Sequence, residues 1–152
     1  MTPEPLELSV TRHIAAPVDT VWRIATERMV DYWCPRPWRV EIVEQEWRAG
    51  GRSAMVMHGP NGEAMPQEGV FLEVTPGVRF VFTDAFAAGW RPQGPFIVGI
   101  VALAAEDGGT RYTATARHWT AEACEQHRAM GFEQGWRTVA DQLAELAEAN
   151  SR

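Results

Sequence analysis

The C-terminal fifth of the chain carries the pattern that decides the fold. Residues 120–150 read TAEACEQHRAMGFEQGWRTVADQLAELAEAN, and Thr120 is suited to cap a helix that starts with acidic residues. We expect one helix from 120 to about 150, about 45 Å long at 1.5 Å per residue. At 100° per residue its apolar side chains form one stripe: Phe132, Trp136, Val139, Leu143 and Leu146. This stripe predicts a helix that is buried along one side.

The segments before this helix have the character of strands and turns. Leu6–Ile14 alternates apolar and polar residues, as a half-buried strand does. Six further strands are expected: Trp38–Trp47, Ser53–His58, Gln67–Val74, Val78–Phe82, Phe96–Leu103 and Arg111–His118. The glycine- and proline-containing turns between them favour antiparallel pairing. We therefore predict a curved antiparallel sheet wrapped around the long helix.

Two short helices are expected between the first strand and the rest of the sheet. Pro17 can start the first, and Glu27–Trp33 can form the second before the prolines at 35 and 37 stop it. Asp84–Pro95 is longer than a hairpin needs and contains Phe86 and Trp90. The whole pattern predicts a single α+β domain over residues 1–152.

Composition narrows the class of partner. Fourteen Lys and Arg against 20 Asp and Glu give a net charge of −6 with no block of like charge, so a nucleic-acid partner is not expected. The longest apolar run, Phe96 to Ala105, is about half of what a membrane span needs. The chain opens with MTPEPLELS, which lacks a leader, and its two cysteines are far apart, so we expect a cytoplasmic protein. Both a monomer and a homodimer remain possible.

No motif indicates metal, cofactor or nucleophilic chemistry. The four histidines include no pair at helical i,i+4 spacing, there is no C-x-x-C, and G-x-S-x-G does not occur. Gly50-Gly51 and Gly108-Gly109 are interpreted as turns, since no phosphate-binding helix follows them. Cys34 is interpreted as a small buried residue. We expect no cofactor and identify no catalytic motif.

The last strand suggests what fills the space under the helix. Tyr112, Ala114, Ala116 and His118 share one face and should point inward. The two alanines either make room for Trp136 or leave an open cavity. Met55 and Met57 on another strand suit either an irregular core or an adaptable apolar pocket.

Polar residues precede the apolar stripe of the helix. Glu125 and Arg128 lie on the same face one and two turns earlier, and either look into a wet pocket or overhang the sheet into solvent. His127 lies off the stripe and is expected to be exposed. Gly131 and Gly135 lower the helix propensity, which predicts that the helix approaches the sheet closely there.

Six motifs in order along the chain resemble those of the SRPBCC superfamily. Within it, the best resemblance is to the bacterial family named for homology to the activator of the ninety-kilodalton heat-shock protein ATPase. The motifs are Arg12-His-Ile-Ala-Ala-Pro17-Val-Asp-Thr-Val-Trp22, Tyr32-Trp33-Cys-Pro35, Gly50-Gly51-Arg52, Gly62 to Gly69-Val70-Phe71-Leu72-Glu73-Val74, Phe80-Val-Phe82-Thr83 and Gly131-Phe-Glu-Gln-Gly135-Trp136. The resemblance implies the START/Bet v 1-like helix grip, in which the sheet encloses an apolar cavity against the C-terminal helix.

These observations predict a protein that binds a small apolar or aromatic molecule by excluding water. The expected cavity residues are Trp33, Met57, Phe71, Phe82, Trp90, Ala116, His118, Arg128 and Phe132. Asp84–Pro95 and Trp33–Pro37 should form the rim, either as a moving gate or as a fixed plug.

Two other functions stay open. One is a cyclase or related lyase that uses His118 or Tyr112 as acid or base with Arg128 and Glu125 assisting. The other is a co-chaperone-like interaction protein.

Overall fold

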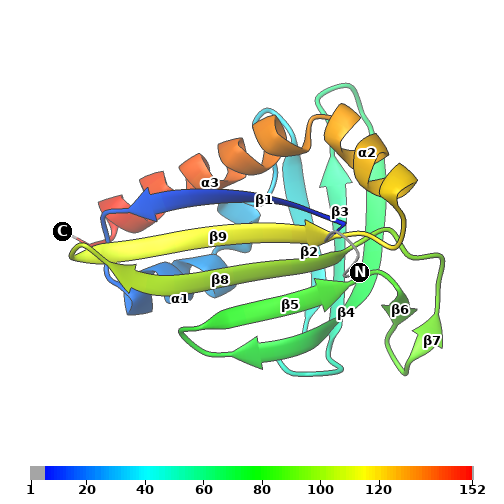
Figure 1. Cartoon of the computed structure of the whole chain (residues 1–152), viewed down its shortest axis with the longest axis horizontal. Helices are drawn as coiled ribbons and strands as arrows, with labels where there is room; N and C mark the ends of the chain where they lie inside the picture. The colour runs from blue at the N-terminus through cyan, green and yellow to red at the C-terminus, as the bar shows by residue number, and fades with distance from the viewer. Residues whose placement is uncertain (1–5, 152) are drawn as a thin grey trace, which may run out of the picture.

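Seven strands form one fully antiparallel sheet in the computed structural model, which describes residues 6–151 (Figure 1). They are β1 (Glu7–Ile14), β2 (Arg39–Gln45), β3 (Arg52–His58), β4 (Ala64–Thr75), β5 (Arg79–Thr83), β8 (Val98–Glu106) and β9 (Gly109–Arg117). Their order across the sheet is β1-β9-β8-β5-β4-β3-β2, so the first strand lies beside the last. The prediction of an antiparallel sheet is confirmed.

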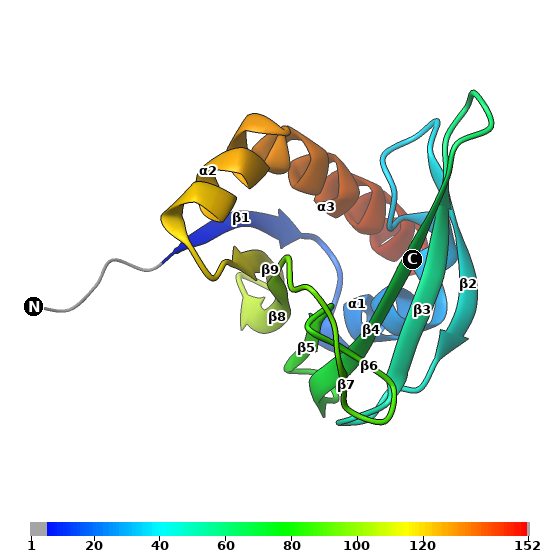
Figure 2. The ribbon, with the colours of Figure 1, turned by 90° about the vertical axis from the view of Figure 1, so that its right-hand side faces the viewer.

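The sheet is strongly curved. Register shifts occur between Ile42 and Glu44 on β2 and between Phe71 and Glu73 on β4. Such bulges bend a strand and increase its twist. Figure 2 shows the resulting curl, with the C-terminal helix α3 (Phe132–Ala149) lying across its open side between β1 and β2. This is the helix grip that the sequence predicts.

The helix after β1 forms as expected, whereas its predicted partner is shorter. Pro17 precedes α1 (Val18–Glu27), which buries Val21, Ile24 and Ala25. The predicted helix Glu27–Trp33 is only a single 3-10 turn, η1 (Met29–Asp31). Arg28 leaves helical geometry with φ −123° and ψ 33°, which ends α1 and leaves too few residues before Pro35 for another full helix.

The predicted single C-terminal helix is in fact two helices. Thr120 caps α2 (Ala121–Ala129) by accepting a hydrogen bond from the Ala123 amide at 3.0 Å, as the sequence predicts. α2 ends at Ala129 with Met130 as its C-cap, and Gly131 has φ +94°, in the left-handed region that a helix cannot continue through. The prediction of continuity was therefore wrong, because Gly131 acts as a break and not as an ordinary helical residue.

Small side chains bring α3 close to its neighbours. The stripe residues Phe132 and Leu143 are buried, while Trp136, Val139 and Leu146 are partly buried. In addition, Ala140, Ala144 and Ala147 are fully buried where α3 packs against β1 and α1. The expected close approach at Gly131 and Gly135 is wrong, because a Cβ at either position would meet no atom within 4 Å. The alanines provide the close packing instead.

The two glycines of this region should respond oppositely to alanine. Gly135→Ala should raise the free energy of unfolding by up to about 1 kcal/mol, because alanine favours a helix and no atom is close enough to clash. Gly131→Ala should lower it by about 1–2 kcal/mol, because a Cβ is strained at φ +94°. Urea denaturation of both variants checks this, and a stabilised Gly131→Ala protein would contradict the assigned break.

The long link after β5 is not simply a loop. Within the predicted segment Asp84–Pro95, β6 (Phe86–Ala87) and β7 (Arg91–Pro92) pair as a separate two-stranded sheet. Trp90 packs on Phe86 with ring centroids 5.8 Å apart.

Across residues 6–151, no helix is both long enough and apolar enough to span a membrane.

Candidate functional site

A cavity of about 610 Å³ lies between the concave face of the sheet and the helices. Most of its wall is formed by aromatic, methionine and aliphatic side chains. These are Met29, Trp33, Trp38, Met55, Met57, Met65, Phe71, Phe80, Phe82, Phe96, Ile97, Met130, Trp136 and Val139. Met65, Phe96 and Met130 are also exposed, which marks where the cavity reaches the surface.

Strand alternation places the sheet part of this wall. Successive side chains of a strand point to opposite faces, so residues two apart share a face. On β3 the lining residues are Ser53, Met55 and Met57, which pair with Gly69, Gln67 and Met65 of β4. Both methionines thus contribute to a pocket, one of the two roles left open for them.

Five aromatic rings form one cluster beside the cavity, and three of them, Phe71, Phe80 and Phe82, line it. Phe80 is at the centre, with its ring centroid 5.1 Å from Trp47, 6.1 Å from Trp22, and 6.2 Å from both Phe71 and Phe82. Its side chain is 1% exposed. Aromatic rings at these distances, three of the four pairs in edge-to-face arrangement, stabilise one another beyond simple burial.

The segment opposite the sheet is held by one buried amide. Gln142 on α3 is 7% exposed, and its Nε2 donates to the carbonyls of Tyr32 and Cys34 at 2.9 and 2.8 Å. Its Oε1 accepts from the Arg36 amide at 3.1 Å. Three hydrogen bonds thus attach the segment between η1 and β2 to α3. Trp33, Cys34 and Pro35 of this segment line the cavity.

The thiol of Cys34 is an apolar part of this wall. Burial raises the pKa of the Cys34 thiol to about 11, so it stays protonated at neutral pH, in keeping with its predicted role as a buried apolar residue.

Tyr112 brings a polar group, its hydroxyl, to the cavity wall. Tyr112 on β9 lines the cavity with only 1% of its surface exposed, and its hydroxyl forms no hydrogen bond with any residue between 6 and 151. Burial raises its pKa well above the ordinary value, so the phenol is neutral. Its inward direction confirms the predicted parity of the last strand.

Two histidines, His118 and His127, form a hydrogen-bonded pair at one end of the cavity. His118 Nε2 lies 2.8 Å from His127 Nδ1, and His118 Nδ1 lies 3.0 Å from the Leu6 carbonyl oxygen. His127 lines the cavity and is 7% exposed, so the prediction that it is exposed was wrong. The helix break explains the error, because the angular pattern of α3 cannot be extrapolated through Gly131 into α2.

The structure brings together some of the predicted site residues and separates others. Trp33, Met57, Phe71 and Phe82 all line the cavity. His118 does not line the cavity but contacts His127, which does. Phe132 is buried beside Trp136, with ring centroids 4.9 Å apart. Ala116 is buried and does not reach the cavity wall. A cavity is present, but neither Ala114 nor Ala116 lines it, and both alanines are fully buried.

The remaining two predicted residues lie at the surface. Trp90 is 57% exposed, and its ring lies over Gly50, so neither it nor Phe86 lines the cavity. Arg128 forms an exposed ion pair with Glu125, which settles the two alternatives for these residues in favour of solvent. Of the predicted rim, Asp84 and the segment Trp33–Pro35 contribute to the wall.

Several wall residues were absent from the prediction. Phe80 and Met55 share strand faces with the predicted Phe82 and Met57, so alternation could have found them. Trp38, Met29 and His127 come from segments that only tertiary packing brings to the cavity. No pattern in the sequence signals them.

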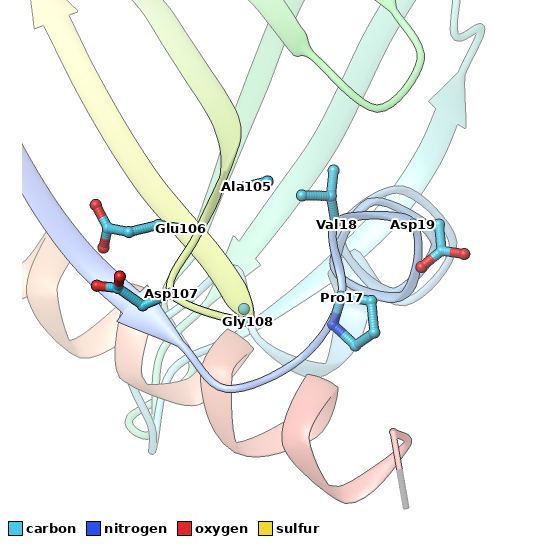
Figure 3. A pocket seen from close by; sticks show the side chains of 8 residues that line it. Pro17, Val18, Asp19, Ala105, Glu106, Asp107 and Gly108 are labelled. Carbon is cyan, nitrogen blue, oxygen red and sulfur yellow. The ribbon is translucent and has the colours of Figure 1, made fainter.

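A second hollow lies at the β8–β9 turn, beside the start of α1 (Figure 3). Glu106 and Asp107 point to one side and Asp19 points to the other. Glu106 is already engaged by His13 and Arg111. Over the part of the chain that the structure describes, no group of three or more His, Cys, Asp or Glu could hold a metal ion. The apolar cavity between the sheet and the helices is therefore the candidate site.

Comparisons with known proteins agree with this geometry. A family model described as "Activator of Hsp90 ATPase homolog 1-like protein" matches residues 15–148. A crystal structure from Nitrosomonas europaea is 36% identical, with a TM-score of 0.91 over 99% of this chain and 98% of that chain. One from Mycobacterium smegmatis is 31% identical, with a TM-score of 0.81 over 96% and 93%. Among curated proteins, none matches the chain significantly.

Proposed function

This chain belongs to the family of Activator of Hsp90 ATPase homolog 1-like proteins, and on that premise we propose that it binds a small, largely apolar or aromatic molecule in the cavity between sheet and helices. The observation that carries the proposal is the cavity itself. Its volume of about 610 Å³ lies within the range of about 300–1,000 Å³ that is usual for small-molecule sites. A cavity of this size in a well-packed domain is larger than any packing defect.

The chemistry of the wall supports an apolar guest. Rings of Trp33, Phe82 and Trp136 face the space, where they can stack on a flat aromatic molecule. Met55, Met57 and Met65 on β3 and β4 add flexible thioethers to the wall, which can adapt to guests of different outline. Binding then draws its free energy from removing apolar surface from water.

The rival enzyme function has less support from the geometry. The acid or base residues Tyr112, on β9, and His118, just after its end, are six residues apart, about 20 Å at 3.3 Å per residue. The proposed helpers Arg128 and Glu125 pair with each other in solvent. The four residues therefore form no joint catalytic group.

Naphthalene tests the proposal, because it is apolar, aromatic and small enough for the cavity. We expect it to bind the folded protein and to change tryptophan fluorescence, since Trp33, Trp38 and Trp136 line the site. Gly135→Trp should weaken binding at least tenfold, because Gly135 lines the cavity and a side chain there meets open space. Gly135→Ala is the matched control and should bind nearly as well as the parent.

Equal naphthalene affinity in the parent and a folded Gly135→Trp protein would place binding outside the cavity. Absence of binding in the parent would overturn the proposal and leave the co-chaperone-like role. Native mass spectrometry of protein purified from its own host adds an independent readout, because a retained guest would identify the chemical class directly.

A further inference from the structure

The two histidines at the cavity end form a directed hydrogen-bond chain. A carbonyl oxygen can only accept, so the 3.0 Å contact between His118 Nδ1 and the Leu6 oxygen places the His118 proton on Nδ1. In the neutral ring the other nitrogen, Nε2, is then an acceptor. The 2.8 Å contact to His127 Nδ1 must therefore be donated by His127. The chain fixes the tautomer of His127 and leaves its Nε2 with a free lone pair.

This lone pair reaches the cavity. No residue between 6 and 151 forms a hydrogen bond with His127 Nε2, although every fully enclosed side-chain nitrogen or oxygen in this part of the chain has a partner. The Nε2 atom therefore touches open space, and His127 lines the cavity. The pKa of His127 is lowered to about 4 by burial and by His118, so the ring is neutral at pH 7.

We propose that His127 Nε2 is the hydrogen-bonding anchor of the cavity and that the guest is an uncharged apolar molecule carrying a hydroxyl group. This inference rests on the proposed function, because it names the polar group of a guest held in that cavity. The hydroxyl donates to Nε2 while the body of the guest lies against the aromatic wall. Phe96 and Trp136 flank the imidazole, with ring centroids 4.7 and 6.3 Å away, and would align such a guest.

Charged guests fit the His127 end of the cavity poorly. A carboxylate has no proton to donate, and the lone pair of Nε2 would repel it. Asp84 also lines the cavity and adds negative charge, whereas the carboxylate of Glu68 is paired with Arg52. An ammonium group could donate, but it would lose its hydration among Phe96, Phe132 and Trp136. A neutral hydroxyl satisfies the acceptor at the least desolvation cost.

Calorimetric titration at pH 7 with three probes of one shape tests the inference: naphthalene, 2-naphthol and 2-naphthoate. We expect 2-naphthol to bind about three- to tenfold more tightly than naphthalene, the gain typical of one hydrogen bond. The carboxylate should bind more weakly than either. His127→Phe keeps a ring in place but removes the acceptor, so the preference for 2-naphthol should fall to one or below.

His58→Phe is the matched control, because His58 is bonded to Glu41 on β2 and lies outside the cavity wall. This variant should keep the preference. If naphthalene binds but 2-naphthol gains nothing, the anchor is wrong while the cavity function stands. If no probe binds, the proposed function fails first. Tighter binding of 2-naphthoate than of 2-naphthol would also overturn the anchor.

A measurement on the unmodified protein keeps the test valid if His127→Phe does not fold. Long-range ¹H–¹⁵N NMR correlations report which imidazole nitrogen carries the proton. We expect His127 to be protonated at Nδ1 and bare at Nε2, with the Nε2 signal shifting on addition of 2-naphthol and much less with naphthalene. A proton on Nε2 in the free protein at pH 7 would overturn the inference.

Discussion

Phe80→Ala is expected to lower the free energy of unfolding by about 3–5 kcal/mol, the usual range for truncating a buried phenylalanine. Phe80 is 1% exposed and contacts Trp22, Trp47, Phe71 and Phe82 at once. Its loss leaves these rings without their common neighbour. Because the site is next to the cavity, the new space joins it and cannot be refilled cheaply by collapse. Domains of this size are stable by only about 5–15 kcal/mol, so the effect is large.

Phe86→Ala serves as the comparison for this prediction. Phe86 lies in the small β6–β7 hairpin, is partly exposed, and has Trp90 as its aromatic partner. We expect a loss of about 1 kcal/mol or less, since little buried surface is removed. Urea denaturation followed by circular dichroism measures both variants. Similar losses for Phe80 and Phe86 would mean that Phe80 is not the centre of the aromatic cluster.

Gln142→Leu is expected to lower the free energy of unfolding by about 3 kcal/mol. The change keeps side-chain volume but removes three hydrogen bonds, each with a net contribution of about 1 kcal/mol. It leaves the carbonyls of Tyr32 and Cys34 and the amide of Arg36 without that partner. For a domain of this length the loss corresponds to a melting temperature about 6–12 °C lower. Calorimetric melting measures it.

Gln134→Leu is the matched control on the same helix, because the Gln134 side chain is exposed. Its melting temperature should stay within about 2 °C of the parent. Gln142→Leu should also weaken naphthalene binding, since the segment that it releases carries Trp33, Cys34 and Pro35 into the cavity wall. A Gln142→Leu protein that melts like the parent would show that the segment is held by other contacts.

Much of the fold could be predicted because it depends on local patterns. Alternation located the strands, and the spacing of Phe132, Trp136, Val139, Leu143 and Leu146 located the helix that lies across the sheet. Alternation also gave the inward face of the last strand, including Tyr112. These patterns arise because one face of each element must be buried, so apolar residues recur at the helix or strand period within the element itself.

The helix break shows where local patterns fail. Glycine in a helical pattern is compatible with continuing the helix or with a left-handed residue, and the sequence alone does not distinguish them. At Gly131 the backbone takes φ +94°, whereas Gly135 four residues later stays helical. The difference depends on how α2 and α3 pack against the rest of the molecule, which is why His127 was assigned to the wrong side.

By itself, the sequence determined the order of the seven strands of the main sheet along the chain, the antiparallel sheet wrapped around a C-terminal helix, and four wall residues, Trp33, Met57, Phe71 and Phe82. Only the tertiary structure decided that a cavity stays open, that Gln142 fastens its far wall, and that His118 orients His127 toward the space. The physical reason is the distance along the sequence between the residues that interact. Periodicity records which side of one element is buried, whereas a cavity and its hydrogen bonds depend on the distance between elements that are about 100 residues apart in sequence, as Cys34 and Gln142 are.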